Sequence, residues 1–176
     1  MVHRDHLDLL RGAVTAQGGL WADFGSGRGA FTLALGELIG PEGAVFSVDK
    51  DGTALRDQVR AMKRQLPSLQ VQYIQDDFTH PLHLPPLDGI VMANALHFFR
   101  PNEKPAVVKQ LKNYLRPHGC LILVEYNVDR GNPWVPFPLS YRAWEALARD
   151  CGFDQTRLLA TVPSRFLKEF YSAESD

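Results

Sequence analysis

Short apolar segments alternate five times with stretches of helical period along the chain, and this alternation limits the available folds more than any other feature. The apolar runs predict strands at 20–24, 44–49, 71–75, 88–94 and 120–126. Helices are predicted at 3–16, 30–40, 53–66, 101–115 and 141–151. Strands that alternate with helices form a mostly parallel sheet, and early strands rich in Val, Ile and Leu indicate helices on both faces. We therefore expect an α/β fold.

The last part of the chain departs from this alternation. Two further strands are predicted at 153–162 and 166–173, with only a short turn between them. Strands joined by a short turn pair in opposite directions, so one of the two should run antiparallel. At 176 residues the chain is long enough to bury a sizeable core, and we expect one domain over 1–176.

Composition argues against several classes of partner. The formal net charge of -1 gives no general attraction to nucleic acid or to an anionic membrane, so neither is expected. The first ten residues carry charges where a signal peptide would need an apolar stretch, and no apolar run reaches the ~20 residues that span a bilayer. Both features favour a cytoplasmic location. Cys120 and Cys151 form no CxxC pair, and His80 and His83 flank a proline without a third ligand, so no metal site is predicted.

The segment 21–31, WADFGSGRGAF, places glycine at every second position between a predicted strand and a predicted helix. Such a turn brings a ligand against backbone N–H groups at a helix N-terminus. A phosphate is the usual ligand in the GxGxxG fingerprint, but Gly25, Gly27 and Gly29 do not have that spacing. The carboxylate of Asp23 would repel a pyrophosphate and would suit an ammonium group. The turn therefore favours a cationic ligand over a dinucleotide.

The motif DFGSGRG resembles the cofactor-binding loop of the class I S-adenosylmethionine-dependent methyltransferases, in which an acidic and an apolar residue precede GxGxG. Four later segments resemble the motifs that follow in this family: VFSVDK, IQDDF, DGIVMANALHFF and LKNYLRPHGCLILVE. The resemblance covers about residues 20–160. It implies a Rossmann-like, doubly wound sheet of seven strands with an antiparallel last strand. It also implies S-adenosylmethionine as cofactor and S-adenosylhomocysteine as product.

The methionine part and the ribose of this cofactor are expected at the first two strands. The bare backbone at Gly25, Ser26 and Gly27 would let the methionine part lie close. Asp23 would favour its ammonium group. Asp49 ends the second strand, and its two carboxylate oxygens can accept both ribose hydroxyls, as an acid does in dinucleotide folds.

The adenine is expected at the third strand. Lys50 is a candidate to flank the ring. Asp77 and Phe78 match the family's adenine contact, with the carboxylate accepting from the exocyclic amine. Asp76 is the competing assignment, since adjacent residues of an extended chain point in opposite directions. Asn94, at the end of the fourth strand, would hold the methionine amino group through its carbonyl.

Methyl transfer is an in-line displacement at an activated carbon, so positioning and exclusion of water are the main tasks. A base is needed only where the nucleophile arrives protonated. His97 is the leading candidate, because imidazole titrates near neutrality. Glu125 and Tyr126, at the end of the fifth strand, are the next candidates. Packing remains an alternative role for His97, and substrate orientation for Glu125.

The region of about 127–144 is the expected substrate wall. Its aromatic residues would either line an apolar pocket or fill the core beneath a long loop: Trp134, Phe137, Tyr141 and Trp144. The tripeptide NPW is similar to a signature of amino-methylating DNA enzymes. In those enzymes the signature follows the fourth strand, where this chain has NALH, so a DNA substrate is not expected.

These features predict an S-adenosylmethionine-dependent methyltransferase that acts on a small-molecule acceptor, as a monomer or homodimer. One alternative is an NAD(P)-dependent oxidoreductase, for which the chain lacks an obvious catalytic half. Another is a non-catalytic module that binds the cofactor and serves as a partner subunit. The acids at 23, 49 and 77 argue against loss of the site.

Overall fold

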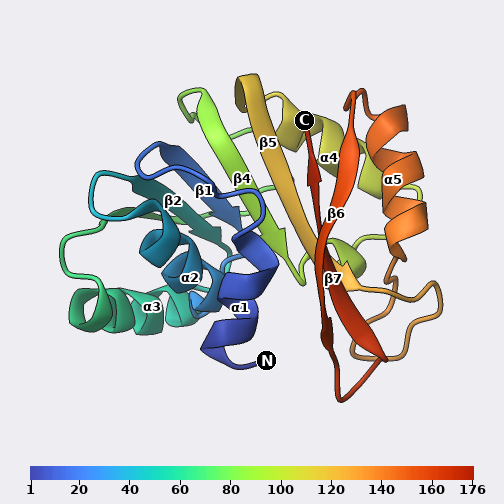
Figure 1. The fold of residues 1–176 in the computed structure, drawn as a ribbon, viewed down its shortest axis with the longest axis horizontal. Coiled ribbons are helices and arrows are strands. Elements are labelled where there is room, and N and C mark those ends of the chain that lie inside the picture. Colours follow the sequence, from blue (N-terminus) through green and yellow to red (C-terminus); the bar gives the residue numbers. More distant parts are fainter.

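One seven-stranded sheet organises the molecule, which is described over residues 1–176 in a computed structural model. The strand order is β3-β2-β1-β4-β5-β7-β6 (Figure 1). The strands are β1 (Leu20–Phe24), β2 (Ala44–Asp49), β3 (Gln70–Gln75), β4 (Leu87–Ala93), β5 (Leu115–Tyr126), β6 (Thr156–Pro163) and β7 (Glu169–Ser175). β1 to β5 pair in parallel, and β7 pairs antiparallel with both β5 and β6. The predicted α/β sheet with an antiparallel last strand is confirmed.

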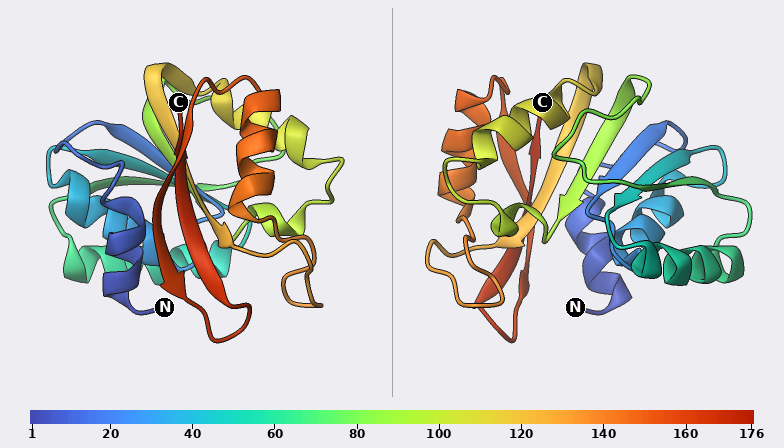
Figure 2. Two further views of the ribbon diagram at one scale, coloured as in Figure 1. Left: turned by 45° about the vertical axis from the view of Figure 1, so that its right-hand side comes forward. Right: turned by 180° about the vertical axis from the view of Figure 1, so that it is seen from behind.

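Helices cover both faces of this sheet, as predicted (Figures 1 and 2). They are α1 (His3–Leu10), α2 (Ala30–Ile39), α3 (Gly52–Gln65), the short 3-10 helix η1 (Leu96–Phe98), α4 (Lys104–Lys112) and α5 (Tyr141–Asp150). The alternating side chains of β5 show how both faces are filled. Leu121 and Leu123 belong to a buried cluster with α4 and α5, whereas Ile122 and Val124 belong to one with α1 and α2. The unbroken apolar run of β5 is the consequence.

The elements that differ most in length from the sequence prediction are the first helix, the fourth helix and the fifth strand, and the last two strands begin at Thr156 and Glu169 rather than at 153 and 166. The first helix ends at Leu10 rather than at 16. Beyond it, Gly12 lies so close to β6 that an added Cβ would be 3.1 Å from Cδ2 of Leu159. The fifth strand begins at Leu115 rather than at 120, because Leu115 pairs with Leu87 at the start of β4. α4 accordingly ends at Lys112.

The parallel order brings the carboxyl ends of β1, β2, β3, β4 and β5 to one edge of the sheet. Ligands bind outside the carboxyl ends of the strands in open α/β sheets. The predicted cofactor residues follow β1 to β4, so the fold places them at this edge. None of the helices combines the length and the apolar character that crossing a bilayer requires.

Candidate functional site

The glycine turn after β1 forms the floor of the site. Gly25, Gly27 and Gly29 all have positive φ, at 76°, 54° and 83°. Two of them are also tightly packed: a Cβ on Gly25 would be 2.7 Å from Cβ of Ala95, and one on Gly29 would be 2.4 Å from Cγ of Gln58. A Cβ on Gly27 would meet nothing within 4 Å. The turn is therefore closely packed against its neighbours at Gly25 and Gly29, whereas space remains beside Gly27.

A buried hydrogen-bond network fixes this turn from below. The hydroxyl of Thr32 donates to Oδ2 of Asp23 at 2.5 Å and accepts from Nε2 of Gln58 at 2.7 Å. Oε1 of Gln58 in turn accepts from the hydroxyl of Ser47 at 3.0 Å, and the hydroxyls of Ser47 and Ser26 share a hydrogen bond at 2.8 Å. All five side chains are buried. The network ties β1, β2, α2 and α3 to the turn.

Asp23 belongs to this network and does not line the cavity described below. Its side chain is only 1% exposed. Burial raises the pKa of the Asp23 carboxyl to about 7, although its hydrogen bond with Thr32 acts in the opposite direction. The charge of Asp49 adds to the increase in this pKa. Asp23 is thus a buried acid beneath the turn.

Asp49 links the end of β2 to the same turn. Its Oδ2 accepts from the backbone N–H of Gly27 at 2.7 Å, and its Oδ1 accepts from the N–H of Asp51 at 2.8 Å. Each carboxylate oxygen has two lone pairs, so both oxygens keep acceptor capacity for a ligand hydroxyl. The backbone bonds hold the carboxylate in one orientation at the cavity wall.

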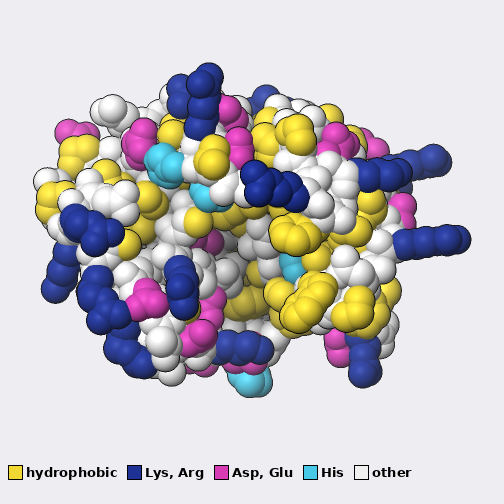
Figure 3. All heavy atoms as spheres, turned by 90° about the horizontal axis from the view of Figure 1, so that it is seen from below, with side chains coloured by type: hydrophobic (Ala, Val, Ile, Leu, Met, Phe, Trp, Pro, Cys, Tyr) yellow, Lys and Arg dark blue, Asp and Glu magenta, His cyan; other side chains and the backbone are white.

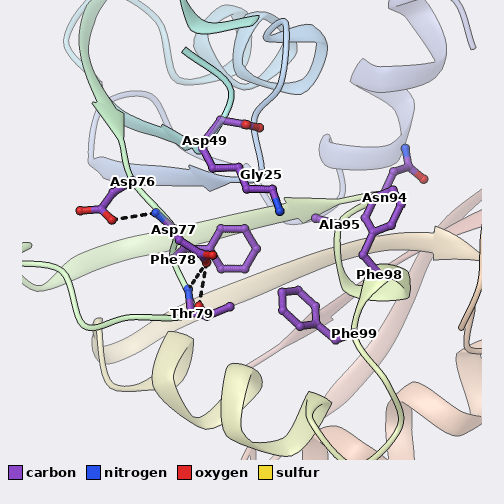
Figure 4. Close-up of a pocket in the computed structure, with 11 residues that line it drawn as sticks. Gly25, Asp49, Asp76, Asp77, Phe78, Thr79, Asn94, Ala95, Phe98 and Phe99 are labelled. Atoms are coloured by element: carbon purple, nitrogen blue, oxygen red, sulfur yellow. Dashed lines mark hydrogen bonds between the residues drawn. The ribbon is translucent and has the colours of Figure 1, made fainter. Parts of the chain in front are cut away.

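A cavity of about 320 Å³ lies at the carboxyl ends of β1 to β4 (Figure 4). It is within the usual size range of small-molecule sites. Its lining consists of Gly25, Asp49, Lys50, Asp76, Asp77, Phe78, Thr79, Asn94, Ala95, Phe98 and Phe99. Figure 3 shows the hollow from this end of the sheet. Three carboxylates against one lysine make the lining acidic.

Most of the predicted cofactor residues meet in this cavity. The residues that line it are Gly25, Asp49, Lys50, Asp77, Phe78 and Asn94, whereas Asp23, Ser26 and Gly27 do not. The four wall residues that the sequence analysis did not name are Thr79, Ala95, Phe98 and Phe99. Phe98 and Phe99 lie in and just after η1, within the quoted fourth-strand motif, so an aromatic pair next to a predicted ligand was the available signal.

The wall after β3 holds an ionised carboxylate. Oδ1 of Asp77 accepts from the backbone N–H of Thr79 at 2.9 Å and from its hydroxyl at 2.7 Å. These bonds lower the pKa of the Asp77 carboxyl. Asp76 also lines the cavity, where its Oδ1 accepts from the N–H of Asp77 at 2.7 Å. The ring of Phe78 packs edge-on against Phe99, with centroids 5.8 Å apart.

Asn94 supplies an unpaired acceptor on the opposite wall (Figure 4). It has φ of 53°, a conformation that asparagine tolerates better than most residues. Its backbone N–H donates to the carbonyl of Val124 at 2.9 Å, which fixes the residue at the end of β4. Its side-chain Oδ1 is buried and has no hydrogen-bond partner. A buried acceptor without a partner is rare in folded proteins, and this one belongs to a residue of the cavity wall.

The three predicted catalytic residues lie together beside the cavity. Nδ1 of His97 is 2.9 Å from Oε2 of Glu125, and the backbone N–H of His97 donates to Oε1 at 3.0 Å. Glu125 is fully buried and His97 nearly so. The ring of Tyr126 is 6.0 Å from that of His97. The adjacent strands β4 and β5 bring these residues together, although 28 positions separate His97 from Glu125.

Lys104 is a buried cation near this pair. Its Nζ donates to the carbonyl of Phe137, and the N–H of Phe137 donates to the carbonyl of His97 at 3.0 Å. Burial lowers the pKa of the Lys104 ammonium, whereas Glu125 raises it. Lys104 therefore attaches the 127–140 loop to the start of α4, and the backbone of Phe137 attaches the same loop to η1.

Comparison with known proteins agrees with this geometry. A family model described as a methyltransferase domain matches residues 22–119, which is more than half of the chain. The chain therefore belongs to this family, and the predicted class I methyltransferase family is confirmed. One curated relative is a carboxy-S-adenosyl-L-methionine synthase from Chromohalobacter salexigens, 28% identical over 117 residues. That match covers 64% of this chain and 43% of the relative.

Solved structures share the fold at low sequence identity. A putative O-methyltransferase from Nostoc punctiforme has a TM-score of 0.78 at 16% identity, over 99% of this chain and 56% of that one. A 1,6-didemethyltoxoflavin-N1-methyltransferase from Burkholderia thailandensis, solved with S-adenosylhomocysteine, has 0.75 at 16%, over 99% and 77%. YcgJ from Bacillus subtilis has 0.73 at 14%, over 98% of both chains. These likenesses confirm the Rossmann-like fold.

Proposed function

We propose that this chain binds S-adenosylmethionine in the cavity at the carboxyl ends of β1 to β4 and transfers its methyl group to a small-molecule acceptor. The observation that carries the proposal is the cavity itself, which three carboxylates line and whose wall includes Asn94, a residue with a buried and unpartnered Oδ1. The cofactor has an ammonium group that can donate to this oxygen, and its sulfonium is positive, so the acidic lining suits it. When bound, it supplies an activated methyl group.

Each wall of the cavity has a part in this binding. The Asp49 carboxylate, oriented by Gly27 and Asp51, accepts from the ribose hydroxyls. The ionised Asp77 carboxylate accepts from the exocyclic amine of the adenine, and the Phe78 ring excludes water beside it. Lys50, on the same wall, flanks the ring. The positive φ of Gly25 and its contact with Ala95 keep the turn flat against the ligand.

His97 takes the acceptor's proton in this proposal. Glu125 accepts a hydrogen bond from Nδ1–H of His97, which leaves Nε2 as the basic nitrogen. Nε2 makes no hydrogen bond to the protein. A protic acceptor atom next to Nε2 would give its proton to this nitrogen, while the cofactor, when bound, would supply the methyl group by cleavage of its S–CH₃ bond and leave as S-adenosylhomocysteine. The ring of Tyr126 lies next to the imidazole and would limit the access of water to it.

A calorimetric titration with S-adenosylmethionine, S-adenosylhomocysteine and NADH tests the binding step. Saturable binding of the first two and no binding of NADH is the expected result. Asp49→Ala should weaken cofactor binding by about 1–3 kcal/mol, since it removes an acceptor for buried hydroxyls. Asp8→Ala, at an exposed acid of α1, is the matched control and should bind normally. An unchanged affinity in Asp49→Ala, or tight NADH binding, would contradict the proposal.

A further inference from the structure

A row of aromatic rings leads away from the cavity. Phe98, which lines the cavity, has its ring centroid 4.3 Å from that of His97. His97 is 6.0 Å from Tyr126, and Tyr126 is 4.1 Å from Phe170 at the start of β7. These four rings, which we call the aromatic row, run from the cavity across the ends of β5 and β7. The Nε2 atom of His97 lies within this row.

Three exposed aromatic side chains lie on the segments around the aromatic row. Phe98 is 62% exposed, Trp134 is 81% exposed and Phe166 is 79% exposed. Trp134 is in the loop after β5, and Phe166 is in the connection between β6 and β7, at the same end of the sheet (Figures 1 and 2). Figure 3 shows hydrophobic side chains gathered beside the hollow on this side. We call these three residues the aromatic rim.

Hydrogen bonds hold the aromatic rim in place. The side chain of Asn132 accepts from the N–H of Trp134 and from that of Val135, both at 2.9 Å. The N–H of Ser164 donates to the carbonyl of Lys168 at 2.8 Å, which closes the turn that carries Phe166. Exposed apolar side chains that gather beside a cavity indicate a binding surface, whereas single scattered ones are common on any protein.

We infer that the aromatic rim, together with His97 and Tyr126 of the aromatic row, binds the methyl acceptor, and that this acceptor is an elongated apolar molecule with one protic group; the buried Phe170 supports Tyr126 from behind. The inference rests on the proposed function. The main support for this inference is that Phe98 belongs to the cavity wall, to the aromatic row and to the aromatic rim, so the three form one continuous surface. The protic group would lie at Nε2 of His97, and the apolar body would extend over Tyr126 toward Trp134 and Phe166.

Binding of a series of 4-alkylphenols, from 4-methylphenol to 4-heptylphenol, in the presence of saturating S-adenosylhomocysteine tests this inference. Calorimetry should show affinity rising roughly twofold or more for each added methylene, as expected for partly buried CH₂ groups. In the double variant Trp134→Ala/Phe166→Ala this gain with chain length should be lost. Leu158→Ala is the control, because Leu158 is 46% exposed but lies near the opposite end of β6.

The outcomes separate the two proposals. Failure to bind S-adenosylhomocysteine would refute the proposed function, while alkylphenol affinity stays measurable without it. Normal cofactor binding with an affinity that ignores chain length would overturn the inference, as would a gain that survives in the double variant. Sedimentation that shows a dimer dissociated by the double variant would assign the aromatic rim to a second copy of the chain instead.

Discussion

Replacing Asp23 by asparagine tests the buried acid beneath the glycine turn. The amide oxygen can still accept from the Thr32 hydroxyl, so the network of Gln58, Ser47 and Ser26 keeps its geometry. What the substitution removes is a carboxyl whose pKa is about 7 in the folded chain, against 3.8 for a free aspartate. The variant therefore isolates the cost of ionising this group inside the protein.

The sign follows from proton binding in the two states. Between about pH 4 and pH 7 the folded chain keeps the Asp23 proton that the unfolded chain has lost, so wild-type stability falls as pH rises through this window. The shift of about three pKa units corresponds to about 4 kcal/mol, reached in full above pH 7. The amide of the variant cannot ionise. The free energy of unfolding of Asp23→Asn should therefore exceed that of wild type by several kcal/mol at pH 8.

Urea unfolding of both proteins at pH 5 and pH 8 measures this effect. The advantage of Asp23→Asn should be about 2–3 kcal/mol larger at pH 8 than at pH 5, because the remaining part of the shift titrates between them. All other groups are common to both chains and cancel in the difference. An advantage that is the same at the two pH values would refute the reasoning.

The same variant decides whether Asp23 contacts the cofactor. The structure places its carboxylate below the turn and outside the cavity lining. If it nevertheless faces the ammonium group, wild-type affinity for S-adenosylmethionine should rise with pH through about 7, and Asp23→Asn should bind weakly at pH 8. If it acts only within the buried network, the two proteins should bind equally.

Three further substitutions have defined outcomes. Gly29→Ala should destabilise the fold by at least about 2 kcal/mol in urea unfolding, since it adds left-handed strain and a clash with Gln58. Gly27→Ala has free space and should cost only about 1 kcal/mol of strain; equal losses in the two glycine variants would contradict this packing. His97→Gln should slow transfer to a protic acceptor by about 10²–10⁴-fold at pH 7 while cofactor affinity is kept. Its rate should recover as pH passes the acceptor's pKa; loss of cofactor binding in this variant would assign His97 to packing.

The sheet and the acid positions were predictable because topology fixes them. A chain in which β1 to β4 run parallel must bring Asp49, Asp77 and Asn94 to one edge, whatever the details of the side chains. His97 and Glu125 were each predicted, but their pairing depends on the register of β4 with β5, in which Ala93 lies opposite Val124. The spacing of residues along the sequence does not determine that register.

The burial of Asp23 beneath the turn was harder to predict from the sequence. Strand side chains alternate between the two faces, so Asp23 points to the same face as Trp21, where α2 covers the sheet. The role of Gln58 was not predicted at all. A glutamine in a helix is normally expected to face solvent. Gln58 is buried because α3 lies close to the glycine turn. The lengths of α1 and β5 likewise depend on contacts with β6 and β4.

The reversed direction of β7 has a consequence for how substrate preference can change. Because β7 runs against its neighbours, its connection to β6 needs only a few residues and falls at the reactive end of the sheet. The proposed cofactor site, built at the ends of β1 to β4, contributes no residue to this connection. Insertions or deletions between Pro163 and Glu169 would therefore change the surface proposed to bind the acceptor and leave the proposed cofactor site unaltered.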